Sequence, residues 1–249
     1  MKVNNSGLII SPSYKNVKCN YRKEIYGCYE EELLVYYEVY MYWDEVIKMK
    51  TNENINYDGW LDRYLIGKVS EITNIIELGC GWGDDTSFLH TLNCNLISCD
   101  KSSESLKFIH KYFPDIETRQ FDLREKFPFQ NETADYIVAD LCLHYFDNID
   151  LNRILLEINR VTKTNGMLYV RVNSINDTNY GVGQGKQISE GIYITETGKK
   201  RFFDKTNILN TFKVFKIISM EEVILMKYGD AKIAWELVLQ KNNISEDIT

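Results

Sequence analysis

The stretch IIELGCGWGDDT, residues 75–86, decides how this chain folds. A run typical of a buried strand leads into three glycines at alternate positions, Gly79, Gly81 and Gly83, and two aspartates follow them. Glycine permits positive φ and a close approach of another group to the backbone. Acidic residues suit the first turn of a helix. The stretch therefore predicts a strand, a tight turn and a helix, with bare backbone at the junction against which a ligand lies.

Strand-like and helix-like patterns alternate along the rest of the chain. The predicted strands cover residues 74–78, 95–100, 117–122, 134–141 and 167–172, and the predicted helices cover residues 84–92, 104–112, 151–161 and 204–211. Two final strand-like runs, residues 212–225 and 233–240, flank a Tyr-Gly-Asp turn and predict an antiparallel hairpin. We therefore expect an α/β fold: a doubly wound, Rossmann-like sheet of seven mostly parallel strands that ends in this hairpin.

Two segments lie outside this alternation. Residues 1–66 precede the first strand and are rich in tyrosine, and they predict a helical extension with one helix over residues 30–50. Its aromatic residues either pack into the core or form a lid, because extensions to such sheets often cover the crevice beyond the strand ends. Within the sheet domain, residues 67–249, the long connection at residues 173–200 predicts an active-site loop insertion, since connections of this length are usually functional or disordered.

The composition is that of a globular protein, with 44% hydrophobic and 26% charged residues. No run reaches the roughly 18 apolar residues that a membrane helix needs. The first residues lack the apolar core of a secretory signal, so we expect a cytoplasmic location. No two cysteines have C-x-x-C spacing, which predicts reduced, mostly buried thiols and no structural metal. The cysteines are Cys19, Cys28, Cys80, Cys94, Cys99 and Cys142.

The net charge of −7 disfavours a nucleic-acid partner, because such binding draws its affinity from clustered lysine and arginine. Lys199-Lys200-Arg201 is the one obvious basic cluster, and we interpret it as part of a solvated loop. A small molecule is therefore the expected substrate.

Acidic residues stand at the carboxyl ends of three predicted strands: Asp100, Asp122 and Asp140. A doubly wound sheet binds ligands outside these ends, and an acidic residue about 20 positions after a glycine turn accepts hydrogen bonds from a ribose. The pattern predicts an adenosine-containing ligand. The glycine spacing is G-x-G-x-G, and Asp84 and Asp85 place negative charge where a dinucleotide's pyrophosphate would lie. A cationic ligand without phosphate, S-adenosylmethionine, fits this charge better than NAD.

At this point the sequence resembles the class I S-adenosylmethionine-dependent methyltransferases. ELGCGWGDD, residues 77–85, is similar to their motif (E/D)-x-G-x-G-x-G. FDLREKFPF (residues 121–129) resembles the segment that meets the adenine amino group, and DYIVADLCLHYF (residues 135–146) resembles the fourth strand and the residues after it. The resemblance covers about residues 70–240, although residues 163–166 lack the proline usual before strand five.

The resemblance implies a role for each matching residue. The glycine turn passes along the methionine part of the cofactor with Glu77 supporting it, Asp100 holds the ribose, and Asp122 accepts from adenine. The implied cofactor-binding residues are Glu77, Gly79, Cys80, Gly81, Asp100, Lys101, Asp122, Leu123, Ala139 and Asp140.

The acceptor side has candidates but no specific motif. His144, just past the fourth strand, is the candidate general base, with a packing or capping role as the alternative. Tyr145, Asn173 and Tyr180 are candidates to line the acceptor pocket, and we expect Arg171 to pair with an acidic neighbour. The resemblance thus implies a methyltransferase acting on a small molecule. The alternatives are an NAD-dependent oxidoreductase and a non-catalytic, S-adenosylmethionine-binding regulatory module.

Overall fold

The computed structural model describes residues 44–195 and 198–242. Most of the expected helix at residues 30–50, with its aromatic stripe, lies outside the described residues, as do Cys19 and Cys28. Residues 44–48 are helical, which is the end of that expected helix. Cys80, Cys94, Cys99 and Cys142 carry free thiols.

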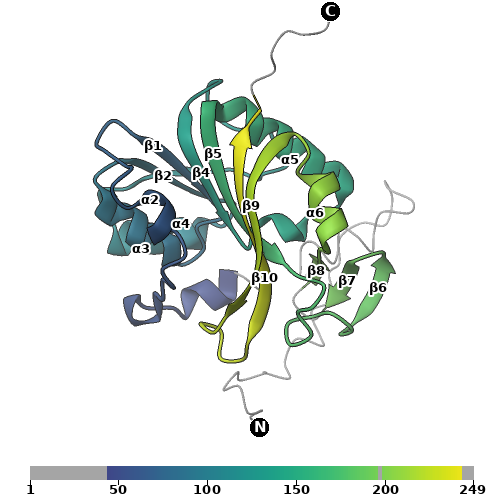
Figure 1. The fold of residues 1–249 in the computed structure, drawn as a ribbon. Coiled ribbons are helices and arrows are strands. Elements are labelled where there is room, and N and C mark those ends of the chain that lie inside the picture. The colour runs from purple at the N-terminus through teal and green to yellow at the C-terminus, as the bar shows by residue number, and fades with distance from the viewer. Residues whose placement is uncertain (1–43, 196–197, 243–249) are drawn as a thin grey trace, which may run out of the picture.

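Seven strands form the main sheet (Figure 1). They are β1 (Asn74–Leu78), β2 (Asn95–Asp100), β3 (Glu117–Gln120), β4 (Ala134–Asp140), β5 (Thr162–Asn173), β9 (Phe215–Leu225) and β10 (Lys232–Lys241). Their order is β3-β2-β1-β4-β5-β10-β9. The first five run parallel, and β10 is antiparallel to both β5 and β9. The expected Rossmann-like sheet with a terminal hairpin is confirmed.

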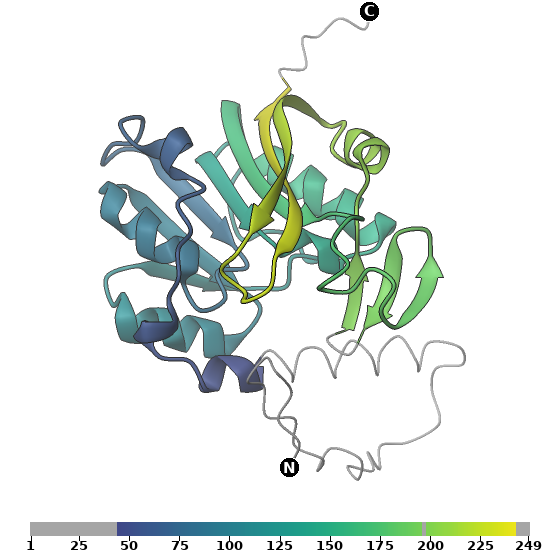
Figure 2. The same cartoon turned by 60° about the horizontal axis from the view of Figure 1, so that its bottom comes forward.

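The helices cover both faces of this sheet (Figure 2). They are η2 (Asn52–Asn54), α2 (Asp62–Leu65), α3 (Asp84–Leu89), η3 (His90–Leu92), α4 (Ser103–Tyr112), η4 (Leu143–Tyr145), α5 (Asn148–Val161) and α6 (Lys205–Thr211). One buried cluster lies under α2, α3 and α4, and a second lies under α5 and α6. Because β1, β4 and β5 contribute to both clusters, their residues are almost all buried, as expected for a parallel sheet.

Side-chain caps set where the longer helices begin. The Ser102 hydroxyl accepts from the Ser105 amide before α4, and the Asp147 carboxylate accepts from the Ile149 and Asp150 amides before α5. The predicted start of α5 at residue 151 is therefore wrong by one turn. Apolar periodicity begins at Leu151, but the cap that satisfies the first amides lies earlier.

Strand β5 begins earlier than the sequence predicts. It starts at Thr162, directly after α5, yet its register against β4 jumps from Ala134↔Thr162 to Tyr136↔Met167. Residues 163–166 therefore form a bulge in the strand, with Asn165 at a φ of 63°.

The segment at residues 173–200, expected to be a loop, contains a second sheet. Three antiparallel strands form it: β6 (Lys186–Ser189), β7 (Ile192–Thr195) and β8 (Gly198–Arg201). The basic cluster Lys199-Lys200-Arg201 lies on β8, so its interpretation as a solvated loop is wrong. Arg201 is buried because its guanidinium packs over the Phe203 ring and donates to Asn148 Oδ1.

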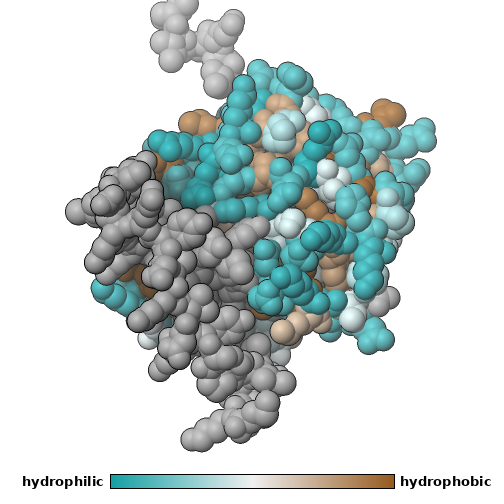
Figure 3. Space-filling model, turned by 180° about the vertical axis from the view of Figure 1, so that it is seen from behind, coloured by the Kyte–Doolittle hydropathy of each residue, from teal (hydrophilic) through white to brown (hydrophobic). Residues whose placement is uncertain are grey.

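The surface of the described residues offers no membrane segment. None of their helices is long and apolar enough to cross a bilayer. The face seen in Figure 3 is mostly hydrophilic, with hydrophobic residues scattered among the polar ones.

Candidate active site

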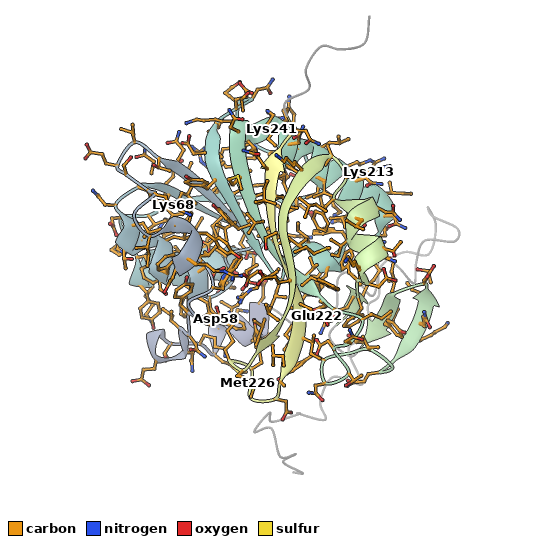
Figure 4. All side chains as sticks on the ribbon, in the orientation of Figure 1. Asp58, Lys68, Lys213, Glu222, Met226 and Lys241 are labelled. Atoms are coloured by element: carbon orange, nitrogen blue, oxygen red, sulfur yellow. The ribbon has the colours of Figure 1, made fainter. Side chains whose placement is uncertain are left out.

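The predicted site residues gather at the carboxyl ends of the parallel strands. Asp58 and Met226 lie toward this end of the molecule, and Lys213 and Lys241 lie toward the opposite end (Figure 4). The adjacent order β2-β1-β4-β5 brings the turns after these strands side by side. The chain thus places residues from distant parts of the sequence around one crevice.

The glycine turn after β1 has one open position. The Gly79 and Cys80 amides both donate to the Cys99 carbonyl, which fixes the turn against β2. A Cβ on Gly79 would lie 2.6 Å from the Cys142 Cβ, whereas a Cβ on Gly81 would meet nothing within 4 Å. Gly79 is therefore required by packing, and only Gly81 leaves bare backbone facing open space. Gly83 has a φ of 84° and serves as the N-cap of α3.

Glu77 joins the turn to two neighbouring elements. Its Oε2 accepts hydrogen bonds from the Thr86 hydroxyl at 2.7 Å and the Ser98 hydroxyl at 2.6 Å. The side chain is buried, and burial raises its pKa to about 7, although the two hydrogen bonds oppose the rise. The carboxyl group thus ties β1 to β2 and α3 and lies below the open glycine.

Asp100 ends β2 beside that open glycine. Its carboxylate accepts from the Gly81 amide at 3.0 Å and from the Ser102 amide at 2.8 Å. Burial raises the pKa of Asp100, and these backbone hydrogen bonds offset part of the rise. Each carboxylate oxygen can accept more than one hydrogen bond, so both retain capacity for a ligand's hydroxyl groups.

Asp122 lies past β3 and is engaged by two cations. Its carboxylate pairs with Lys101 at 3.0 Å and with Arg124 at 2.6 Å. Although burial raises the pKa of Asp122, these contacts outweigh burial and lower it to about 2. Leu123 is partly buried against the core and Ala139 is fully buried in β4. The predicted adenine contacts Asp122 and Leu123 thus follow β3, whereas the predicted methionine contact Ala139 packs in the core.

Arg171 and Asp140 form a buried ion pair at the ends of β5 and β4. The guanidinium donates to both Asp140 oxygens at 2.7 Å and to Asp58 at 2.7 Å, and it lies 4.5 Å from the centre of the Trp60 ring. Although burial opposes it, Arg171 together with Lys227 holds the pKa of Asp140 below its usual range. The expectation that Arg171 pairs with an acidic neighbour is confirmed.

Lys227 matches no sequence motif and is not among the predicted site residues. It lies in the turn between β9 and β10, and its side chain is only 4% exposed. Its ammonium is 3.3 Å from Asp84, 3.5 Å from Asp140 and 3.9 Å from Asp58. A lysine in a hairpin turn is ordinarily solvated, so only the folded arrangement of three separate segments identifies it.

Two hydrogen bonds hold the segment at residues 56–60 over the same crevice. The Asn56 amide donates to Asp84 at 2.8 Å, and the Trp60 indole N–H donates to the buried Asp85 at 2.9 Å. Burial raises the pKa of Asp85. A cavity of about 550 Å³ lies between this segment and the β9–β10 hairpin, lined among others by Trp60, Arg171 and Lys227.

The predicted acceptor residues divide into two groups. His144 and Asn173 are buried, and the His144 Nδ1 and both amide atoms of Asn173 have no hydrogen-bond partner in the described residues. The Tyr145 ring is tilted against the His144 ring, with ring centres 4.3 Å apart. Tyr180 instead donates to the Tyr228 carbonyl at 2.8 Å, which ties the loop after β5 to the hairpin turn. His144 and Tyr145 lie in η4, which packs against β5 with its last residue Asn173, and Tyr180 has a visible structural role.

His144 is a weak base in this setting. Burial, followed by the charges of Lys232 and Lys200, lowers its pKa well below 6.5. The imidazole is therefore neutral at ordinary pH and holds a proton poorly. This favours a hydrogen-bonding role over proton abstraction.

Residues 75–166 match a family model described as a methyltransferase domain. No curated protein matches the chain in sequence. The matched residues contain the glycine turn, the three acidic strand ends and η4.

Solved structures share the fold at low sequence identity. A methyltransferase from Methanosarcina mazei, described as S-adenosylmethionine-dependent, superposes with a TM-score of 0.62 and 17% identity, covering 75% of this chain and 98% of that one. The N-methyltransferase NodS from Bradyrhizobium japonicum, solved with S-adenosylhomocysteine, gives 0.61 and 12%, covering 82% and 98%. The 1,6-didemethyltoxoflavin-N1-methyltransferase from Burkholderia thailandensis, solved with its substrate and S-adenosylhomocysteine, gives 0.61 and 14%, covering 89% and 94%.

The family model covers the glycine turn and the acidic residues after the parallel strands. Residues 75–166 therefore match a methyltransferase domain, and the chain shares its fold with solved S-adenosylmethionine-dependent methyltransferases.

Proposed function

We propose that this chain binds S-adenosylmethionine across the turn after β1 and transfers its methyl group to a small-molecule acceptor. The observation that carries the proposal is the open backbone at Gly81, beside a carboxylate, Asp100, that retains acceptor capacity. Structures with the same fold hold S-adenosylhomocysteine, which supports the same ligand here.

The residues present fit this cofactor. Asp100 would accept from the ribose hydroxyls, and Asp122, already oriented by Lys101 and Arg124, would accept from the adenine amino group. Four carboxylates near the methionine end, from Asp58, Asp84, Asp85 and Asp140, suit a ligand that carries an ammonium and a sulfonium. The same charges disfavour the pyrophosphate of NAD.

When bound, the cofactor supplies a methyl group already activated by the positive sulfur. The chain's own contribution is to position the two reactants and exclude water. Its glycine turn and acidic strand ends hold one reactant, and Asn173, His144 and Tyr145 surround the point where an acceptor would meet it. Because His144 holds a proton poorly, the nucleophilic atom of the acceptor reaches the site already deprotonated.

A small-molecule acceptor is supported by the enclosed position of these residues. Strand β8 of the β6–β8 sheet packs against η4, so protein encloses the acceptor end of the site. The toxoflavin precursor bound to the Burkholderia enzyme shows that a protein with this fold accommodates a small ring compound.

The test is calorimetric titration of the whole chain with S-adenosylhomocysteine and, separately, with NAD. We expect binding of the first alone, and Asp100→Ala should weaken it by about 1–3 kcal/mol because ribose hydroxyls lose an acceptor. Asp115→Ala, which changes an exposed aspartate, is the matched control. Binding of NAD alone would refute the proposal.

Transfer itself distinguishes an enzyme from a regulatory module. The chain is incubated with methyl-tritiated S-adenosylmethionine and a library of small nucleophiles. If the wild-type chain forms a labelled product and Asp100→Ala does not, the chain is an enzyme. Tight cofactor binding without transfer to any acceptor would favour the regulatory alternative.

A further inference from the structure

A second polar cluster lies past the ends of β4 and β5, and five segments contribute to it. Asn173 ends β5, His144 lies in η4, Asp177 follows β5, Lys200 lies on β8 and Lys232 begins β10. η4 packs against both β5 and β8, which brings these segments together. We call these five residues the acceptor cluster.

Two members of the acceptor cluster are buried without partners. His144 is 3% exposed and Asn173 is 0% exposed. The His144 Nδ1 and both the Nδ2 and Oδ1 of Asn173 make no hydrogen bond within residues 44–195 and 198–242. Buried polar groups in native proteins are almost always hydrogen-bonded, so unpartnered groups on two elements that pack together, η4 and β5, indicate a ligand that completes them.

Both lysines of the acceptor cluster, Lys200 and Lys232, lie close to its other residues. Asn173 pairs with Ala234 across the β5–β10 ladder, so Lys232, two residues before Ala234, points to the same face of the sheet. The Lys232 ammonium pairs with Asp177 at 3.0 Å. The charges of Lys200 and Lys232 both act on His144, and that of Lys232 also acts on Lys200, so the three groups lie close together.

The acceptor cluster carries an excess positive charge. It holds two ammonium groups, one carboxylate and a neutral imidazole. The ammonium of Lys200 makes no ion pair or hydrogen bond with any residue that the structure describes, and burial, followed by Lys232, lowers its pKa to about 8. Asp140, the next carboxylate that acts on Lys232, is already engaged by Arg171 and Lys227. A largely buried charge without a counter-ion is unfavourable, so an anion would stabilise the cluster.

We propose that Lys200, His144 and Asn173 bind an anionic oxygen group, a carboxylate or a phosphate, of the methyl acceptor. This rests on the proposed function. The Lys200 ammonium supplies a charge-assisted hydrogen bond, and the imidazole, protonated at Nδ1, and the Asn173 Nδ2 supply two neutral ones. The Asn173 Oδ1 accepts from a hydroxyl or amine of the same molecule. Lys200 thereby selects acidic acceptors over neutral ones.

The test is NMR of the chain loaded with S-adenosylhomocysteine, titrated with sodium acetate and, separately, with inorganic phosphate. The chain has three histidines, so each Cε1–H signal is assigned with the surface variants His90→Gln and His110→Gln. Sodium chloride at equal ionic strength is the blank. We expect a saturable shift of the His144 signal alone, and the anion that binds more tightly identifies the oxygen group.

Variants at β8 separate charge recognition from folding. Lys200→Met should weaken anion binding by about tenfold, because one charge-assisted hydrogen bond is lost, and Lys200→Arg should restore the binding. Lys199→Met, one position along the strand, should leave it unchanged. The inference would be overturned if neither anion shifted the His144 signal saturably, or if Lys200→Met responded to the anion as the wild type does. Calorimetry measures S-adenosylhomocysteine binding separately. If this ligand does not bind, the proposed function is refuted, not the inference about the anion.

Discussion

Gly79, Gly81 and Gly83 share a left-handed φ, but the space around each one differs. Gly79 packs against Cys142, and Gly83 caps α3 with Ile109 3.0 Å from the position of a Cβ. Only Gly81 faces open space. At the scale of single residues, the glycines of one motif therefore differ: Gly79 is required by packing, Gly81 leaves open space and Gly83 caps a helix.

Alanine at Gly79 should mainly reduce stability, whereas alanine at Gly81 should mainly reduce cofactor binding. Gly79→Ala should destabilise the fold by about 3 kcal/mol or more, because strain at positive φ adds to a clash with Cys142. Gly81→Ala should cost about 1 kcal/mol of stability but weaken the binding of S-adenosylhomocysteine by about 1–3 kcal/mol, because the new Cβ occupies the ligand's space. Urea unfolding and calorimetry measure the two effects. Equal losses of stability in both variants would contradict this assignment.

Glu77 predicts a pH dependence of stability. Burial raises its pKa from 4.5 to about 7, so the folded chain holds the proton more tightly than the unfolded chain. Its contribution to stability is full below about pH 4.5 and is lost as the pH rises through about 7. Glu77→Gln keeps an acceptor for Thr86 and Ser98, so at pH 8 it should be more stable than wild type by about 3 kcal/mol. Urea unfolding at pH 4.5 and 8 checks this, and a difference that does not change with pH would argue against it.

At the scale of elements, the β9–β10 hairpin reaches from the edge of the sheet to the crevice. Its turn carries Lys227, whose ammonium lies among carboxylates from β4, from α3 and from the segment at residues 56–60. The Tyr180 hydroxyl holds the same turn through the Tyr228 carbonyl. The hairpin thus closes the sheet and also sets the charge at the methionine end of the proposed cofactor site.

Lys227→Met should change the preference between two forms of the cofactor. Removing one positive charge favours the ligand with a sulfonium over the neutral thioether, by an energy on the order of 1 kcal/mol in a partly polar site. The ratio of the two dissociation constants, S-adenosylhomocysteine over S-adenosylmethionine, should therefore rise several-fold. Calorimetry with both ligands measures it, and Lys216→Met, exposed at the far end of β9, is the control. An equal change for both ligands would show that Lys227 acts through packing alone.

At the scale of the whole molecule, the net charge is −7 and the basic cluster at residues 199–201 is engaged within the fold. Arg201 packs on Phe203, Lys199 pairs with Asp147 and the charge of Lys200 acts on His144, so this part of β8 offers phosphate groups little positive charge. In a partly buried position the Lys200 charge attracts a small anion more strongly than it would in water.

This arrangement predicts that the chain does not bind nucleic acid. A fluorescent single-stranded RNA and a duplex DNA should show no retention in filter binding at about 50 mM salt, where phosphate contacts are strongest. A basic nucleic-acid-binding domain serves as the positive control. Retention that falls steeply as salt rises would reveal a phosphate-binding face and would remove the argument for a small acceptor.

The fold could be predicted because its signals are local. The central strands β1, β4 and β5 are largely buried and contain short apolar runs, and Ser102 and Asp204 mark helix starts because their side chains cap the first turns. The strand ends at Asp100 and Asp140 are where the sequence places them. The β6–β8 sheet was missed because β6 is exposed throughout, so its residues carry no alternation of apolar and polar side chains.

The sequence by itself determined the sheet, the glycine turn and the acidic rim, because strand burial and turn geometry depend on neighbours close along the chain. Only the tertiary structure decided which glycine faces open space, that Lys227 lies among three carboxylates, and that Lys200 turns toward His144 and Asn173. These are contacts between segments far apart in the chain. Their energies depend on burial and on charges brought together by strand order, which no local pattern of residues encodes.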